Sequence, residues 1–265
     1  MRKYIRMGLR KGYRILTSSI RFSEYAKNPK KYPLEERYRY THDFMNDMNK
    51  AFHVKLVIKG EENIIDGSCF YTPNHDSVMD PIVLLMAMKR PITFVAKKQA
   101  AGMPFVSKIL KAIDGKFIDR NDLRSELKVF KELDQELEQE KDLSVVIFPE
   151  GTRSKVSDDF RLLPFHPGSF KVPTRRDLPI VPVCLYLTDR ILNQKYHYKR
   201  YPVQLTFLKP LYPEDYKDLS TAQISDIVYQ RIDEELQRMK KLDFGYIREF
   251  NGYSDKKTKK VQIIR

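Results

Sequence analysis

Apolar side chains recur every three or four residues through the first 21 positions of the chain, a spacing typical of one face of an α-helix. They are Ile5, Leu9, Tyr13, Leu16 and Ile20. The same 21 residues contain seven Lys and Arg and no acid, which is typical of a helix lying among anionic lipid headgroups. A terminal helix packed on the protein, with its basic face in solvent, would show the same pattern. A second helix is predicted over residues 34–51. Residues 1–52 are therefore expected to form a helical, membrane-associating segment.

Beyond residue 53, short apolar segments alternate with longer amphipathic ones. The short segments predict strands at 54–58, 68–71, 93–96, 116–118, 143–148, 180–187 and 203–207. The longer segments predict helices at 81–88, 105–112, 123–137 and 221–239. In the third of these helices Leu127 belongs to the apolar stripe, together with Phe130 and Leu133.

This alternation predicts an α/β fold: a mostly parallel or mixed twisted sheet with helices on both faces, preceded by an appendage of the two N-terminal helices. Residues 53–245 are expected to form the α/β domain and residues 246–265 a basic C-terminal tail.

The charge balance of the 265-residue chain favours anionic partners. It has 49 Lys and Arg against 35 Asp and Glu, a formal net charge of +14. Nucleic acid, anionic lipid headgroups, phosphorylated substrates and acidic carrier proteins all fit such a field. The longest uncharged run, residues 178–188, has 11 residues, whereas a membrane span needs about 20 apolar ones. The two cysteines form neither a disulfide framework nor a zinc site, and no metal is expected.

The first segment that carries chemistry is residues 74–81, Asn-His-Asp-Ser-Val-Met-Asp-Pro. It follows a predicted strand, at the sheet edge where open α/β sheets place their sites. If the loop folds the His75 imidazole back onto the Asp80 carboxylate, one ring nitrogen is fixed and the other is left as a general base. Alternatively, Asp80 is an ordinary cap before Pro81 and His75 a satisfied loop histidine. A metal site using both residues lacks a third ligand nearby.

Three further segments are suggestive only together. In residues 115–120, Arg120 follows a short strand and could hold a phosphate or carboxylate, or simply form a surface salt bridge. In residues 148–154, Phe-Pro-Glu-Gly-Thr-Arg-Ser, an acid, a glycine, a hydroxyl and Arg153 meet in one loop, as in an anion site or a tight polar turn. Residues 178–183 hold two prolines in a strand-like run, which by itself is only structural.

Together and in this order, the four segments resemble the motifs of the glycerolipid acyltransferase family, whose best-known members are the 1-acyl-glycerol-3-phosphate acyltransferases. Asn74 to Asp80 resembles N-H-x4-D, and Phe148 to Ser154 matches F-P-E-G-T-R-S. Gly115 to Arg120 resembles G-x-x-F-I-x-R, one residue short, and Ile180 to Val183 a V/I-P-V/I block. The resemblance covers residues 74–183 and is thin over 1–50 and 210–265.

The resemblance implies a role for each matching residue. His75 would deprotonate the acceptor hydroxyl, and Asp80 would orient His75. Arg120 would hold the phosphate, with help from Lys97 or the neighbouring Lys98, of which Lys97 is favoured. The remaining residues would bind the glycerol-phosphate and shape the site; they are Glu150, Gly151, Thr152 and Arg153.

The reaction implied is acyl transfer from acyl-CoA or acyl carrier protein to lysophosphatidic acid, giving phosphatidic acid for phospholipid biosynthesis. No cofactor is expected beyond the acyl donor. The enzyme would lie on the cytoplasmic face of the cell membrane, attached to an anionic surface without spanning it. No Gly-x-Ser-x-Gly elbow occurs in the sequence, which favours direct transfer over an acyl-enzyme.

Other functions remain open from the residues alone. The acceptor could be glycerol-3-phosphate or another lysolipid. A basic nucleic-acid-binding protein would suit the charge, although the sequence has no zinc finger or other evident nucleic-acid-binding motif, and nucleic acid is not the expected partner. A metal-dependent hydrolase that uses His75 and Asp80 is the third alternative.

Overall fold

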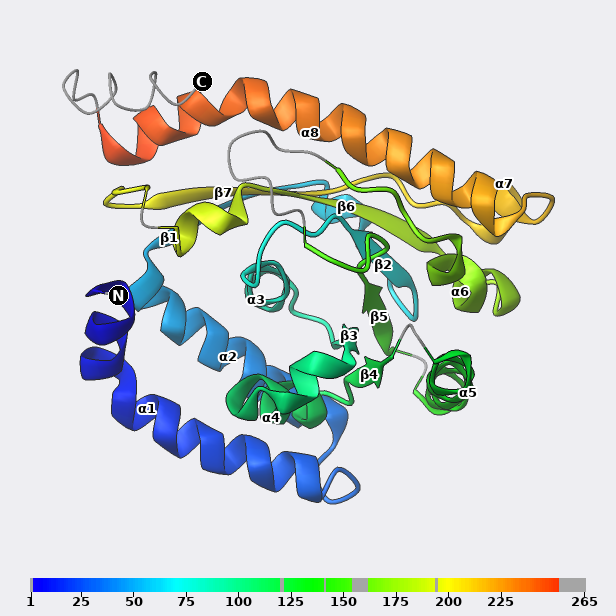
Figure 1. Ribbon diagram of the computed structural model, residues 1–265, viewed down its shortest axis with the longest axis horizontal. Helices are drawn as coiled ribbons and strands as arrows, with labels where there is room; N and C mark the ends of the chain where they lie inside the picture. Colours follow the sequence, from blue (N-terminus) through cyan, green and yellow to red (C-terminus); the bar gives the residue numbers. More distant parts are fainter. Residues whose placement is uncertain (1, 120–121, 141, 154–161, 194, 253–265) are drawn as a thin grey trace.

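The computed structural model describes residues 2–119, 122–140, 142–153, 162–193 and 195–252 (Figure 1). For residues 2–10 and 123 it describes the backbone alone. The strands are β1 (Val54–Lys59), β2 (Phe70–Pro73), β3 (Ile92–Lys97), β4 (Lys116–Ile118), β5 (Ser144–Ile147), β6 (Ile180–Tyr186) and β7 (Tyr201–Phe207). The helices are α1 (Arg2–Lys27), α2 (Leu34–Phe52), α3 (Asp80–Ala87), α4 (Pro104–Ala112), α5 (Leu123–Gln139), α6 (Lys171–Arg175), α7 (Pro213–Tyr216) and α8 (Thr221–Asn251).

The strands form one mixed seven-stranded sheet in the order β1-β7-β6-β2-β5-β3-β4. Every neighbouring pair is parallel except β6 and β7. Strands β2, β3 and β5 therefore end at the same edge of the sheet. The loops that leave β2 and β5 carry the His75 and Glu150 segments, so the topology brings these two distant segments together.

Helices cover both faces of the sheet, as predicted (Figure 1). On β6, Val181, Val183 and Leu185 point into a core shared with α1 to α4. The alternate residues Ile180 and Cys184 point to the other face and pack under α8. On β5, Val145 and Ile147 pack with α5 on that second face. Because both faces are buried, these strands are continuously apolar in sequence.

The N-terminal helix pair precedes the sheet, as predicted, and it shares the sheet's core. Phe22 and Tyr25 of α1 and Phe44 of α2 are buried in the same apolar cluster as strand residues such as Val203. Phe22 meets Phe44 edge to face, with ring centroids 5.3 Å apart. The buried Arg37 of α2 also donates to the Ala112 carbonyl at 2.7 Å. The pair therefore packs against the sheet and shares its core.

The structure also corrects details of the sequence-based prediction. Helix α8 continues to Asn251, so residues 246–251, expected in the tail, are helical; residues 253–265 lie outside the described range. Leu127, expected in the buried stripe of α5, is 59% exposed. The short helices α6 and α7 were not expected, because four or five residues are too few to show a helical period. In the part of the chain that the structure describes, no helix is long and apolar enough to cross a membrane.

Candidate active site

His75 and Asp80 form a hydrogen-bonded pair where β2 leads into α3. The His75 Nδ1 atom lies 2.7 Å from Asp80 Oδ2. The Asp80 side chain is fully buried, whereas the His75 side chain is 19% exposed. The imidazole stacks on Phe148, with ring centroids 4.2 Å apart. A fixed Nδ1 and a fixed ring plane leave Nε2 as the nitrogen that can exchange a proton with a substrate.

Asp80 organises the loop before it and does not cap α3. It is the first residue of that helix, and the cap position is occupied by Met79, which makes no side-chain cap bond. Asp80 Oδ2 accepts the backbone N–H groups of Asp76 at 2.7 Å and Ser77 at 2.8 Å. The Thr188 hydroxyl donates to Asp80 Oδ1. The alternative of an ordinary cap before Pro81 is therefore wrong.

Two further side chains hold the His75 loop from opposite sides. The buried Asn74 amide donates to the Leu185 carbonyl at 2.9 Å and accepts from the Leu185 N–H at 2.8 Å, as a strand partner would. On the other side, Glu150 Oε1 accepts the His75 N–H at 2.6 Å. Glu150 Oε2 accepts the Leu163 N–H at 3.0 Å. The backbone of His75 is thus tied to both β6 and the loop after β5.

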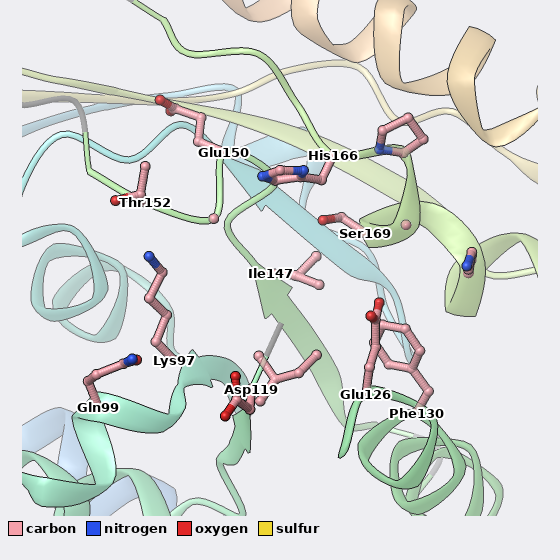
Figure 2. Close-up of a pocket in the computed structure, with 15 residues that line it drawn as sticks. Lys97, Gln99, Asp119, Glu126, Phe130, Ile147, Glu150, Thr152, His166 and Ser169 are labelled. Atoms are coloured by element: carbon pink, nitrogen blue, oxygen red, sulfur yellow. The ribbon is translucent and has the colours of Figure 1, made fainter. Parts of the chain in front are cut away.

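A cavity of about 610 Å³ opens beside this loop, lined by Lys97, Glu150, Gly151, Thr152 and residues from four other segments. Figure 2 shows Lys97 reaching from the end of β3 toward Thr152, with Asp119 below it and Ser169 on the far wall. His75 is not among the lining residues, but Glu150, whose carboxylate accepts the His75 N–H, is one of them. The His75–Asp80 pair and the cavity are therefore linked through Glu150.

A family comparison agrees with this arrangement. The acyltransferase family model matches residues 55–186, about half of the chain and all of the site so far described except Thr188. The chain belongs to the acyltransferase family.

Individual relatives extend the match. A probable 1-acyl-sn-glycerol-3-phosphate acyltransferase of Mycoplasma pneumoniae is 28% identical over 233 residues, which cover 82% of this acyltransferase and 85% of the relative. The 1-acyl-sn-glycerol-3-phosphate acyltransferase of Cocos nucifera is 28% identical over 170 residues, 62% of this chain and 54% of the relative. This acyltransferase thus spans most of the first relative and about half of the second.

A solved structure supports the fold. The 1-acyl-sn-glycerophosphate (LPA) acyltransferase of Thermotoga maritima superposes with a TM-score of 0.64 at 22% identity. The superposition covers 86% of this chain and 88% of the other. The seven-stranded sheet and its helix pair are therefore the acyltransferase fold.

Of the other residues predicted for the acyltransferase site, some line the cavity, some do not, and one lies outside the described residues. Lys97 lines the cavity, whereas the Lys98 ammonium lies 3.4 Å from Asp119 Oδ2 and is not a lining residue. Gly151, at φ +62°, turns the chain in the left-handed region that favours glycine, so that Thr152 faces the cavity. Arg153 is exposed and does not line it. Arg120 lies outside the described residues.

Burial changes the acid–base behaviour of two carboxyl groups in this acyltransferase. Burial, with the nearby charges of Asp80 and Asp189, raises the pKa of Asp76 to about 7. Burial raises the pKa of Glu150 to about 8, although its hydrogen bonds from the His75 and Leu163 amides act in the opposite direction. Both carboxyl groups therefore change charge near neutral pH, within one residue or one hydrogen bond of His75.

Sequence reasoning missed several residues of the acyltransferase site. Thr188 is 108 positions from Asp80, and an isolated threonine after a strand carries no recognisable signal. His166, Ser169 and Lys171 line the cavity wall opposite Lys97. The Pro-Gly pair at 167–168 indicates a turn between β5 and β6. That turn signal could have marked the segment as a candidate wall, but not its distance from His75.

Proposed function

We propose that this acyltransferase moves a fatty acyl group from an acyl thioester to the hydroxyl of lysophosphatidic acid, giving phosphatidic acid. The observation that carries the proposal is the His75–Asp80 pair, held by the chain on both sides, next to a cavity lined by Lys97 and Thr152. The relatives named above act on the same class of acceptor according to their names. The finer assignment of the acceptor to this chain is our inference.

The proposed step is direct transfer. His75 Nε2 takes the proton of the acceptor hydroxyl as its oxygen attacks the thioester carbonyl carbon, forming the new C–O bond. The tetrahedral intermediate collapses as the C–S bond breaks. The thiolate leaves, and His75 retains the proton. Asp80, fixed by two amides and a hydroxyl, orients the imidazole. The thioester is already activated, so no cofactor other than the donor is needed.

We assign the phosphate of the acceptor to the end of the cavity nearest Glu150. Lys97 supplies a cation there and Thr152 a hydroxyl. Arg153 and Arg120 are proposed to add guanidinium groups, whose planar donors fit a phosphate. Because both Glu150 oxygens accept backbone amides, its proposed role is to place the His75 loop against the phosphate site rather than to contact substrate.

We propose that the enzyme works as a peripheral protein on the cytoplasmic face of the cell membrane, and that nucleic acid is not its partner. The support is the exposed apolar side of α1. Tyr13, Leu16 and Ile20 are 83%, 64% and 67% exposed, on a helix whose first 21 residues hold no acid. Exposed apolar side chains beside cations match an interface of acyl chains and anionic headgroups.

Replacing the base tests the mechanism. His75→Ala is expected to lower kcat for acyl transfer to lysophosphatidate by at least about 100-fold, because general-base catalysis is lost. His197→Ala, which removes an exposed histidine outside the site, is the control and should leave kcat unchanged. Circular dichroism should show both variants folded. Near-normal turnover by folded His75→Ala protein would contradict the mechanism.

A substrate panel tests the acceptor. Purified enzyme with a labelled acyl donor is offered lysophosphatidate, glycerol-3-phosphate or lysophosphatidylcholine. We expect the highest kcat/KM with lysophosphatidate, because it combines the phosphate with an acyl chain. Preference for glycerol-3-phosphate, or for the choline lipid, would keep the acyltransferase chemistry but replace the proposed acceptor.

A further inference from the structure

The outward side of α5 carries an apolar residue among cations. Leu127 is 59% exposed there, and Arg124, Lys128 and Lys131 are exposed around it. Positions 124, 127, 128 and 131 follow the i, i+3, i+4, i+7 spacing, so they share one side of the helix over a length of about 10 Å. We refer to these four residues as the α5 stripe.

The acids and the cations of α5 differ in the contacts that they make within the described residues. Three of the acids in the second half of α5 are paired: Asp134 with Arg175, Glu136 with Lys116 and Glu138 with Arg176. By contrast, no hydrogen bond or ion pair engages the side chains of Arg124, Lys128 or Lys131 within the described ranges of the chain. These three cations are therefore available to bind a partner molecule.

Stability does not explain these cations either. The N-terminal turns of a helix carry partial positive charge, so acids are favoured there and cations are disfavoured. In α5, Arg124 lies in the first turn together with Glu126, and the last turn holds no base. An exposed leucine also gains nothing from the fold. A binding role accounts for both features.

The stripe stands at the wall of the proposed active site. Glu126 and Phe130 belong to the same turns of α5 and line the cavity (Figure 2). The cavity also contains Lys97, Glu150 and Thr152. A partner seated on the outward side of these turns is thus one helix width from the space where the thioester must arrive.

We propose that the α5 stripe docks an acidic acyl carrier protein, which delivers its thioester on a flexible arm into the cavity; this inference rests on the proposed function. An acidic protein surface complements three cations in a row, and Leu127 supplies an apolar anchor between them. The nucleotide of acyl-CoA needs donors that converge on its phosphates, whereas these cations are spread along a convex helix.

A bilayer fits the stripe less well than a protein. α5 packs on the face of the sheet that contains Val145 and Ile147. α1, with its exposed apolar residues, belongs to the core on the opposite face (Figure 1). The exposed apolar residues of α1 and the α5 stripe therefore belong to helices on opposite faces of the sheet.

The test compares two donors that carry the same acyl chain. The full-length triple variant Arg124→Glu/Lys128→Glu/Lys131→Glu is assayed with acyl-CoA and with an acidic acyl carrier protein loaded with that chain. We expect kcat/KM with the carrier to fall at least about tenfold, since charge reversal removes the complementary surface, and kcat/KM with acyl-CoA to stay within about twofold. All three positions are exposed, so the variant should fold. Leu127→Ala is expected to show a smaller loss with the same donor selectivity.

A matched control separates docking from overall charge. Lys209→Glu/Lys217→Glu/Lys241→Glu makes the same change in net charge at exposed positions on other elements and should leave both donors unaffected. An equal loss with both donors, or no loss with the carrier, overturns the docking surface. Loss of binding to anionic vesicles by the triple variant overturns it in favour of a bilayer contact. Wild-type enzyme inactive with both donors overturns the proposed function itself.

Discussion

α1 and α8 are the two longest helices of the chain, and they place similar apolar stripes in opposite environments. On α8, Ile224, Val228 and Ile232 are fully buried against the sheet. On α1, Tyr13, Leu16 and Ile20 are mostly exposed, and the buried contacts come from another side of the helix, through Phe22 and Tyr25. Near its end α8 is further anchored by the ion pair of Asp243 with the buried Arg190.

The difference shows what an apolar period does and does not establish. A spacing of three and four predicts a helix with an apolar side, and it was correct for both helices. It does not say whether that side meets the protein or something else. The flanking charges carried the extra information, because seven cations and no acid surround the α1 stripe, whereas acids and bases are mixed on α8.

The largest effect should come from truncating a buried side chain on α8. Ile232→Ala is expected to lower the free energy of unfolding by about 2–5 kcal/mol, because it removes buried methyl groups and leaves a cavity. Leu16→Ala on α1 should change it by less than about 0.5 kcal/mol. Urea unfolding followed by circular dichroism measures both. Equal losses from the two variants would mean that the α1 stripe is also part of the core.

The second test concerns what the α1 stripe contacts. Leu16→Glu/Ile20→Glu is expected to lower partitioning onto anionic vesicles by about tenfold or more, since two apolar anchors are replaced by charges that the headgroups repel. Leu242→Glu, at a partly exposed position of α8, is the matched control and should bind as the wild type does. Co-sedimentation measures the bound fraction. Unchanged binding by the α1 variant would leave its exposed stripe without a lipid role.

The smallest effect is a difference in pH response between the two regions. Hydrogen bonds from Lys11 of α1 and from Lys50 lower the pKa of Asp47, so the stability from this contact is present above the ordinary pKa of an aspartate and is lost as the pH falls through the lowered value. In the His75 loop, burial raises the pKa of Asp76 from 3.8 to about 7. The folded protein holds a proton there that the unfolded chain releases, so stability falls as the pH rises from about 4 to 7 and levels off above that.

Two variants should separate these two pH-dependent losses of stability. Asp76→Asn is expected to flatten the fall of Tm between about pH 4 and 7 without changing the loss below about pH 4, because the amide cannot ionise. Asp47→Asn should do the reverse, since it removes the ionised partner of Lys11. Thermal scans from pH 3 to 9 measure both profiles. A wild-type Tm that rises between about pH 4 and 7, and that Asp76→Asn leaves unchanged, would refute the burial account of Asp76.

Much of the fold could be predicted from the sequence because its signals are local. The strands at 116–118 and 180–187 and the helix at 105–112 were correct to within a residue or two. Leu127 failed because periodicity places a residue on a helix without saying how far the neighbouring chain covers it. Sheet order and the single antiparallel pair β6–β7 were not predicted, since they depend on pairings between distant segments.

The site was predictable where one loop carries the chemistry. The His75–Asp80 contact was inferred from their spacing of five positions in one loop, and the structure contains it. The separation of Lys97 from Lys98 could not be inferred, because adjacent residues at a strand end point in different directions. The cavity wall formed by His166, Ser169 and Lys171 could not be predicted, because it depends on how the chain folds back after β5. The roles of these residues in binding stay predictions.

The hydrogen bonds between the Asn74 side chain and Leu185 affect when the candidate active site can form during folding. The loop that holds His75 is hydrogen-bonded to Glu150, Leu185 and Thr188. Each of these residues lies 75 to 111 positions further along the chain than the loop residue that it bonds. During synthesis from the N-terminus, the imidazole cannot reach its working position until β6 and the turn after it have emerged. Contacts between residues so far apart are slow to form. Catalytic competence should thus arise late in folding, after the helix pair of α1 and α2 has been made.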